Sequence, residues 1–529
     1  YLDSCTINWT LNGVLQSPTI WSGHSPEDFN DTITIGYYSQ RNSTFDTIMA
    51  WVSMPNGVVD SVSYDDTVKI ISYGCSSTLN GEFIVGHNPG ANFSSIENAF
   101  FVAGLCGVDG DVILKLQNGI YAENWDCSNL SDLIGNFTLS ITSLSGNRDS
   151  VILKPTSGVG IILNNTNNLV LKNITIDNSI SNAYGIQFTG GANNVEIRNI
   201  YFNGNTYGTT ASNSRAPIYK ATNTGVVDNI RFINNIINGG YYGLYFYGGT
   251  SNTTRGVNCI VDSNVFINQA YYATYFYFTN YNSVSYNTFK DRMTNTTTNW
   301  YGLWFRSCNG TIINANTIIS NNTSSLDRYG IYCYSMVSTI ISNNSIHLSN
   351  NIRNAFGLYT YYTEDLFVIN NTVLVEGSSG TTYYGFWFNA LSTSYNATIQ
   401  NNIFITTGTT NCYPIYTSSV TAITNYNIDY NCYYGPAYVG YAVSAKATLA
   451  DLELSVPSDQ HSVNLNPSFI NVNNNLKLNN YTGLECNRYP NVKYDIEGIF
   501  RNIRTTMGCY TFALVGSNGA LVEILHFDI

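Results

Sequence analysis

The chain is poor in charged residues, and this shortage excludes several classes of function. Only 11% of its 529 residues are Asp, Glu, Lys or Arg, against about 25% in an average soluble protein. The 22 basic residues are outnumbered by 34 acidic ones and form no basic stripe, so nucleic acid is not an expected partner. No run of about 20 apolar residues occurs, so no membrane span is expected.

Metal-binding and nucleophile motifs are also missing. The five histidines are scattered, and no Cys-x-x-Cys pair, Ser-His-Asp set or nucleophile elbow is visible. We therefore predict no metal and no cofactor. Three pairs among the 11 cysteines look bridgeable, although sequence cannot fix the pairing: Cys106 with Cys127, Cys412 with Cys432, and Cys486 with Cys509. For Cys308 and Cys333, which lie in repeat strands, a buried free thiol is an equal alternative.

What the sequence has in abundance is a repeat. A phrase of an aromatic, a small, an aliphatic and usually another aromatic residue starts at positions 184, 242, 301, 329, 356 and 384, with weaker copies at 216, 272 and 413 and spacings of 26 to 32 residues. An asparagine follows 15 residues after five of these starts, at Asn199, Asn287, Asn316, Asn344 and Asn371. Turn-forming residues separate two or three short strands in each unit. A unit this short cannot bury its own apolar face, but stacked units can.

The repeat predicts an all-β fold, a right-handed parallel β-helix. Its coils should be spaced by about 4.8 Å, with the recurrent asparagines hydrogen-bonded between coils. Residues 75–155 should form the N-terminal cap and first coils, residues 156–440 the main coils, and residues 441–512 the C-terminal cap. A capping-box pattern at Ser94 and Glu97 predicts a helix over about 94–104, and 449–454 suggests a short helix.

The remaining segments lie at the two ends. Residues 1–74 contain alternating strand patterns at 7–11, 32–35 and 47–52, which favour an immunoglobulin-like β-sandwich that is possibly truncated. Residues 513–529 are interpreted as a linker or the start of a further domain. The chain opens at Tyr1 without a signal peptide, which suggests a processed piece of a longer protein.

The repeat phrase also predicts a binding surface. Its third residue should face the core, and its fourth should point outward because strand side chains alternate. Eight consecutive coils carry Tyr or Trp at the fourth position: Tyr219, Tyr245, Tyr275, Trp304, Tyr332, Tyr359, Trp387 and Tyr416. Such an aromatic stripe is typical of a carbohydrate- or partner-binding platform. The alternative is a structural ladder that stacks on itself or lies under another domain.

Parts of the chain resemble secreted surface proteins of Bacteroidota. Residues 1–74 are similar to CARDB-type immunoglobulin-like repeats at 7–14, at Trp51 with Pro55-Asn56-Gly57, and at Asp65-Asp66-Thr67. The segments 92–96, 106–108 and 119–121 resemble the opening of pectate-lyase-like parallel β-helices. Residues 495–508 resemble their close, except that Glu497 replaces an Asp. The resemblance implies a large, modular, secreted protein of the cell surface.

A further pattern fits that origin. Asp followed by Ser or Thr and an aliphatic residue resembles the Bacteroidota O-glycosylation signal. It marks Thr32, Thr47, Ser61, Thr67 and Ser150 as candidate modification sites. Chance is the alternative, because strands rich in Thr and Ile generate such triplets.

Catalysis is not expected. Glycoside hydrolysis needs two carboxyl groups about 5–9.5 Å apart, and the sparse acids between 160 and 430 avoid the outward strand positions of the phrases. No acidic cluster suggests a calcium site. We predict an extracellular, cell-surface protein of adhesive or structural type that binds a polysaccharide or a surface protein partner through the stripe. It is expected to be part of a larger chain or assembly. The alternatives are a polysaccharide lyase or glycoside hydrolase, and a purely architectural subunit of a surface assembly.

Overall fold

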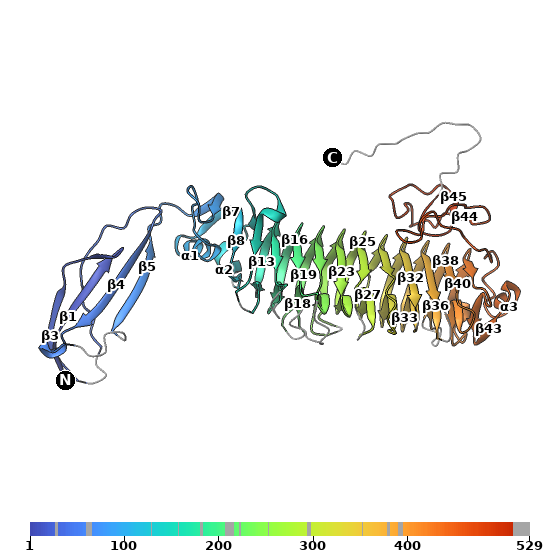
Figure 1. The fold of residues 1–529 in the computed structure, drawn as a ribbon, viewed down its shortest axis with the longest axis horizontal. Helices are drawn as coiled ribbons and strands as arrows, with labels where there is room; N and C mark the ends of the chain where they lie inside the picture. Colours follow the sequence, from blue (N-terminus) through green and yellow to red (C-terminus); the bar gives the residue numbers. More distant parts are fainter. Residues whose placement is uncertain are drawn as a thin grey trace, which may run out of the picture.

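The computed structural model shows a long parallel β-solenoid preceded by a small antiparallel sheet (Figure 1). It describes residues 1–511 except 27–29, 60–65, 129, 157, 180–183, 207–215, 222–223, 252, 294–297, 352, 378–380 and 390–394. The candidate site Ser61 and the segment 513–529 lie outside the described residues. Within them, the prediction of an all-β parallel solenoid is confirmed.

Three long sheets form the walls of the solenoid, and each coil contributes one strand to each. Sheet 1 contains β6 (Leu79–Val85), β7 (Val108–Leu116), β10 (Leu139–Ser143), β13 (Thr166–Lys172), β16 (Ala192–Arg198), β19 (Val227–Ile233), β22 (Gly256–Asp262), β25 (Thr279–Ser285), β28 (Ile312–Asn314), β31 (Val337–Ser342), β34 (Glu364–Ile369), β37 (Ala397–Gln400) and β40 (Tyr426–Asp429).

Sheet 2 contains β8 (Gly119–Tyr121), β11 (Val151–Leu153), β14 (Thr175–Asp177), β17 (Tyr201–Asn203), β20 (Ile236–Asn238), β23 (Val265–Gln269), β26 (Thr288–Asp291), β29 (Thr317–Ser320), β32 (Ser345–Asn351), β35 (Thr372–Gly377), β38 (Ile403–Thr406) and β41 (Cys432–Tyr434).

Sheet 3 contains β9 (Trp125–Asp126), β12 (Ile161–Leu163), β15 (Ile186–Phe188), β18 (Ile218–Lys220), β21 (Tyr242–Tyr247), β24 (Tyr272–Tyr277), β27 (Trp300–Arg306), β30 (Arg328–Tyr334), β33 (Ala355–Tyr361), β36 (Tyr383–Phe388), β39 (Cys412–Thr417), β42 (Gly440–Ala442) and β43 (Ser444–Lys446). Only its last pair, β42 and β43, is antiparallel.

The core and the small residue of the phrase follow from the stacking of coils. The third phrase position is fully buried in the central coils, as predicted, at Ile186, Ile218, Leu244, Thr274, Leu303, Ile331, Leu358 and Phe386. The small second residue is explained by close approach of the next coil. A Cβ atom on Gly330 would lie 2.5 Å from the carbonyl oxygen of Gly357, and one on Gly357 would lie 2.7 Å from that of Gly385. At these two glycines the backbone of the next coil therefore leaves no room for a side chain.

An asparagine ladder runs through the turn between sheets 1 and 2. Its eight members are Asn235, Asn264, Asn287, Asn316, Asn344, Asn371, Asn402 and Asn431. Each amide nitrogen donates to the Oδ1 of the next member at 2.9–3.0 Å. Four predicted members are confirmed, and Asn199 is also hydrogen-bonded between coils, since its amide donates to the Oδ1 of Asn173 in the preceding coil at 2.8 Å, but it lies outside this ladder. It stands one residue early, at a left-handed φ of 51°, and in its coil Ile200 occupies the ladder position and donates its N–H to Asn235. Varying loop lengths break the fixed offset of 15.

The N-terminal region is one antiparallel sheet. It comprises β1 (Leu2–Leu11), β2 (Val14–Leu15), β3 (Thr19–Ser25), β4 (Phe45–Ser53) and β5 (Thr67–Tyr73), with β1 at the centre of the pairing. The predicted strand at 32–35 is wrong, because this segment has no regular structure. The adjoining Gly36 lies against the buried Trp9, because a Cβ atom on Gly36 would come within 2.4 Å of that indole. The second sheet of a sandwich is not formed by the described residues.

Helix α1 (Ile96–Cys106) closes the first coil, as predicted, and α2 (Leu130–Ile134) follows nearby. The buried residues of α1, Ile96, Ala99 and Val102, pack into the solenoid core. The capping residue differs from the prediction. Ser95, and not Ser94, accepts the N–H of Asn98, at 3.1 Å.

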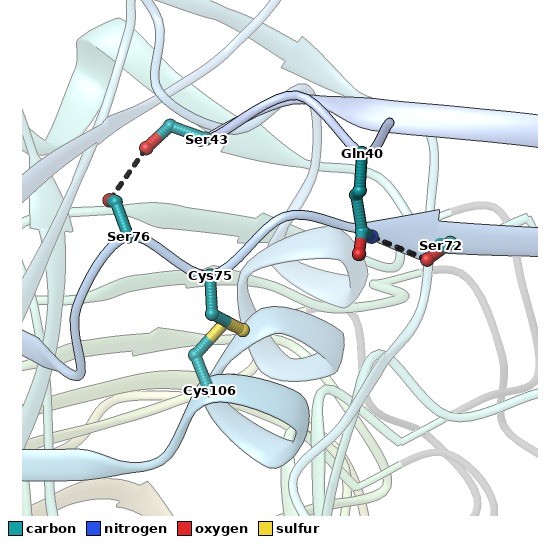
Figure 2. Close-up of a disulfide and its surroundings, with 6 residues drawn as sticks. All are labelled: Gln40, Ser43, Ser72, Cys75, Ser76 and Cys106. Carbon is teal, nitrogen blue, oxygen red and sulfur yellow. Dashed lines mark hydrogen bonds between the residues drawn. A yellow bond between two sulfur atoms is a disulfide. The ribbon is translucent and has the colours of Figure 1, made fainter. Parts of the chain in front are cut away.

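The predicted disulfides are wrong. Among the described residues the structure forms one disulfide, which joins Cys106 at the end of α1 to Cys75 at the junction with the N-terminal sheet. Figure 2 shows it beside two contacts that join the segment around Cys75 to residues 40–43, Gln40 with Ser72 and Ser43 with Ser76. The other five predicted partners are buried free thiols: Cys127, Cys412, Cys432, Cys486 and Cys509. Cys412 in β39 and Cys432 in β41 lie in different sheets, because 20 residues are less than one coil.

For the two repeat cysteines, the alternative of a buried free thiol is correct. Cys308 and Cys333 are both fully buried free thiols. The disulfide between Cys75 and Cys106 indicates a compartment that is oxidising, and therefore not the cytoplasm.

The C-terminal region covers the end of the solenoid and then turns back along it (Figure 1). Helix α3 (Leu449–Glu453), at the predicted position, buries Leu452 against the last coil. The chain returns through β44 (Glu485–Asn487) and β45 (Arg504–Thr506). Three coil asparagines anchor this returning segment: Asn343 donates to Tyr494 O at 2.9 Å, Asn370 to Gly508 O at 3.3 Å, and Asn401 to Asn487 O at 2.8 Å.

Candidate functional site: an aromatic face on sheet 3

The predicted aromatic stripe is a continuous stack of rings on the outer side of sheet 3. Parallel, in-register strands place Tyr275 beside Trp304, and Trp304 beside Tyr332. Every neighbouring pair from Tyr219 to Tyr416 is stacked, with ring centroids 4.2–6.4 Å apart and planes within 18°. Tyr441 extends the stack by one ring at 4.5 Å. We call these nine residues the central ladder.

Two further columns widen this surface. The first phrase position forms a parallel column of Tyr242, Tyr272, Tyr301, Tyr329, Phe356, Tyr384 and Tyr413. The sixth position forms another, of Tyr247, Tyr277, Arg306, Tyr334 and Tyr361. We call the three columns together the aromatic face. Strict alternation would place the first position inside, but the structure leaves it partly exposed in β21, β24, β27, β30, β33 and β36 and buries the small second residue instead.

One cation is built into the sixth-position column. The guanidinium of Arg306 lies 5.0 Å from the ring centroid of Tyr277 and 5.0 Å from that of Tyr334. Cation–π contacts of this kind hold the guanidinium against the rings. Arg306 therefore takes the place of an aromatic ring in that column.

Stacking decides which part of each ring faces outward. The rings cover one another's faces, so the central ladder is half-buried and presents mainly edges and hydroxyl groups. Burial among the rings raises the pKa of Tyr245, Tyr275 and Tyr332 above the ordinary value. These phenols are neutral at any physiological pH, and each can donate and accept hydrogen bonds. The ring faces of the central ladder are therefore covered by neighbouring rings, and the outward-facing ring edges remain exposed.

Carboxylates are absent from the strands of this face. No Asp or Glu occurs in strands β12 to β42 of sheet 3. The nearby acid Asp291 is buried and pairs with Arg328 at 3.0 Å, where both side chains are 1% exposed. It also accepts from Ser320 at 2.7 Å. This carboxylate is committed to the structure and does not point at the aromatic face.

No metal centre is visible in the part of the chain that the structure describes. There, no three His, Cys, Asp or Glu side chains come together in a way that could hold an ion. Within the same residues, no helix combines the length and the apolar character needed to cross a membrane.

The candidate glycosylation sites lie in different surroundings. Thr32 and Thr67 are exposed, whereas Thr47 in β4 is partly buried. Ser150 is partly buried, and its hydroxyl contacts Ser145 at 2.6 Å and Asn147 O at 2.7 Å. Their modification stays a prediction.

A second hollow was not foreseen from the sequence. A cleft of about 290 Å³ lies between sheet 1 and the returning segment, lined among others by Phe367, Tyr489, Lys493 and Tyr494. Its two walls are more than 100 residues apart in the chain. No local sequence pattern predicts such a cleft.

Comparison with known proteins finds only distant likenesses. No protein-family model matches the chain, and no curated protein matches it. Among solved structures, a periplasmic alginate epimerase matches at 12% identity over 76% of this chain and 84% of that one, with a TM-score of 0.35. A mannuronic acid-specific polysaccharide family 6 lyase from human gut microbiota matches at 11%, over 73% and 92%, with a TM-score of 0.30. A family 28 exopolygalacturonase of Yersinia enterocolitica matches at 8%, over 81% and 87%, with a TM-score of 0.22. At these identities and TM-scores, the likenesses carry no argument about this chain.

Proposed function

We propose that this chain is an extracellular, non-catalytic adhesive protein that binds a neutral polysaccharide along the aromatic face. The observation that carries the proposal is the unbroken, in-register central ladder, whose eight consecutive phrase positions span about 35 Å at the ordinary interstrand spacing. A rigid row of amphipathic side chains loses little conformational entropy when it binds an extended polymer. Tyr and Trp offer both apolar contact and hydrogen-bonding tips.

The two tryptophans are the proposed anchors. Trp304 lies between Tyr275 and Tyr332, and Trp387 lies between Tyr359 and Tyr416. On one side of each indole the next ring is distant, at 5.9 Å for Tyr332 and 6.4 Å for Tyr416. Because these ring planes are within 15° of parallel, the longer centroid distances mark a sideways offset. Together with the larger indole, this offset leaves more ring face for a sugar than the closely stacked phenols do.

Charge supports a neutral ligand and a non-catalytic role. The chain has a net charge of −12, which disfavours long polyanions. The carboxylate pair that glycoside hydrolysis needs has no counterpart on the strands of the aromatic face. The N-terminal sheet, interpreted as an immunoglobulin-like module, would act as a spacer that the disulfide fastens to the solenoid.

A second candidate is a purely architectural role, which the covered ring faces favour. Stacked aromatic pairs contribute about 0.5–1.5 kcal/mol each beyond their burial, so the ladder could serve mainly to stabilise the coils. In that case the rod would be a structural element of a surface assembly.

Size-exclusion chromatography with neutral and acidic polysaccharides separates these functions. We expect the protein to co-elute with a neutral polymer. In the double variant Trp304→Ala/Trp387→Ala, the amount of protein that co-elutes should fall at least tenfold. Tyr286→Ala, which removes a 50% exposed tyrosine outside the aromatic face, is the matched control and should bind normally. Binding unchanged in the double variant would refute the proposal, no binding at all would favour architecture, and shortened polymer would show an enzyme.

A further inference from the structure

A group of tyrosines gathers where sheet 3 turns toward sheet 1. Tyr334 in β30 and Tyr361 in β33 occupy the same register position. Their rings are stacked, with centroids 5.7 Å apart and planes within 23°. Tyr362 follows directly, with its ring centroid 4.0 Å from that of Tyr361 and the two hydroxyl oxygens 3.0 Å apart. Tyr395 of the next coil lies 6.3 Å from Tyr362. We call these four residues the rim cluster.

We propose that the rim cluster is a site of oxidative modification, at which a dityrosine bond joins Tyr334 to Tyr361. The oxidant is hydrogen peroxide acting through a haem peroxidase. Each phenol loses one electron and one proton, and the two phenoxyl radicals couple through their ortho carbons. The two ortho hydrogens move to the phenol oxygens, which restores both aromatic rings. The peroxide takes up two electrons and two protons and becomes two water molecules.

Geometry favours this pair over other tyrosines. Coupling requires two radicals to meet, and here the β-ladder already holds the rings face to face, so neither has to diffuse. The two residues are 27 positions apart, so the bond links successive coils. Tyr334 and Tyr361 are partly exposed, and the adjoining Tyr362 is 38% exposed. The rings in the middle of the face, such as Tyr245 and Tyr275, have a ring of their own column on both sides, whereas Tyr334 has Tyr361 on one side and the guanidinium of Arg306 on the other.

The surroundings also suit the reaction. The disulfide between Cys75 and Cys106 indicates an oxidising compartment, which lacks the cytosolic thiol reductants that would compete for peroxide. A covalent link between coils constrains the unfolded chain in the way a disulfide does. The rod would thereby resist local unwinding, whether it binds a glycan or only builds a surface. The inference therefore does not depend on the proposed function.

The test uses the full chain treated with horseradish peroxidase and hydrogen peroxide at low protein concentration. The monomer is isolated by size exclusion, its dityrosine fluorescence is measured, and the linked peptides are mapped by mass spectrometry. We expect monomer that has lost two hydrogen atoms, with the link between Tyr334 and Tyr361. The variant Tyr361→Phe should lower monomer dityrosine at least threefold.

The control is Tyr286→Phe, which removes the hydroxyl of a 50% exposed tyrosine in the turn after β25, away from the rim cluster. It should leave the yield unchanged, and circular dichroism should show that both variants are folded. The proposal is overturned if the monomer contains no dityrosine, if dityrosine occurs only in dimers, or if Tyr361→Phe leaves the yield unchanged.

Discussion

Removing one asparagine from the buried ladder should destabilise the solenoid severely. Asn344 is completely buried. Its amide donates to Ile313 O at 3.0 Å and to Asn371 Oδ1 at 2.9 Å. Its Oδ1 accepts both the backbone N–H and the side-chain amide of Asn316 at 3.0 Å. In Asn344→Ala the carbonyl of Ile313 and the backbone N–H of Asn316 lose these partners inside the protein.

The size of the effect follows from those two groups. A buried polar group without a partner costs about 1–3 kcal/mol, so the variant should lose about 2–6 kcal/mol of the free energy of unfolding. The control is Asn282→Ala, which removes an exposed asparagine whose amide contacts Asn258 at 3.4 Å. A surface change of this kind should stay within about 0.5 kcal/mol.

Denaturant unfolding, followed by the fluorescence of the buried Trp300 one coil away, measures the difference. Long repeat arrays do not always unfold in one step, so the midpoints of the two variants are compared with that of the parent chain. A midpoint for Asn344→Ala equal to that of the control would show that the ladder contributes little and that the strands alone hold the turn.

Three further predictions concern other parts of the rod. Burial raises the pKa of Asp459 to about 7. An unfolded Asp titrates near 3.9, so the unfolded state releases its proton first as the pH rises, and stability should fall between about pH 4 and pH 7 and then level off. The free energy of unfolding should fall by about 4 kcal/mol over this range, at 1.36 kcal/mol per pKa unit. Thermal melts across this pH range should show a smaller fall in Asp459→Asn than in the parent chain. The same pH dependence in both proteins would contradict this prediction. Gly330→Ala places a Cβ 2.5 Å from Gly357 O, so it should lower the melting temperature by several degrees, and an unchanged temperature would show that the coils can separate. The double variant Cys75→Ser/Cys106→Ser should make the junction at least several-fold more sensitive to limited proteolysis while leaving the far coils resistant. Unchanged cleavage would mean that noncovalent packing such as that of Phe45 against Phe101 holds the junction alone.

The sequence carried enough information for the solenoid because its signals are local and repeated. The same phrase position is buried in successive coils, so the core could be predicted from residues such as Leu303, Ile331 and Leu358. The following position faces outward, so Trp304, Tyr332 and Tyr359 predicted the outer ladder. Four ladder asparagines were found for the same reason. Asn199 was misplaced because its spacing matched by coincidence while the loop of its coil differed in length.

Contacts between distant segments were decided only by the tertiary structure. Nearness in sequence suggested Cys127 as the partner of Cys106, but the end of α1 faces the N-terminal junction and Cys75. The cleft beneath the returning segment depends on Asn343 meeting Tyr494 from 151 residues away. Whether the aromatic rings would show their faces or their edges was also open in the sequence. Coil spacing settles it: strands at the ordinary interstrand distance bring the rings into mutual contact, so the residue types fix that a ladder exists, and the stacking of coils fixes which part of it the solvent meets.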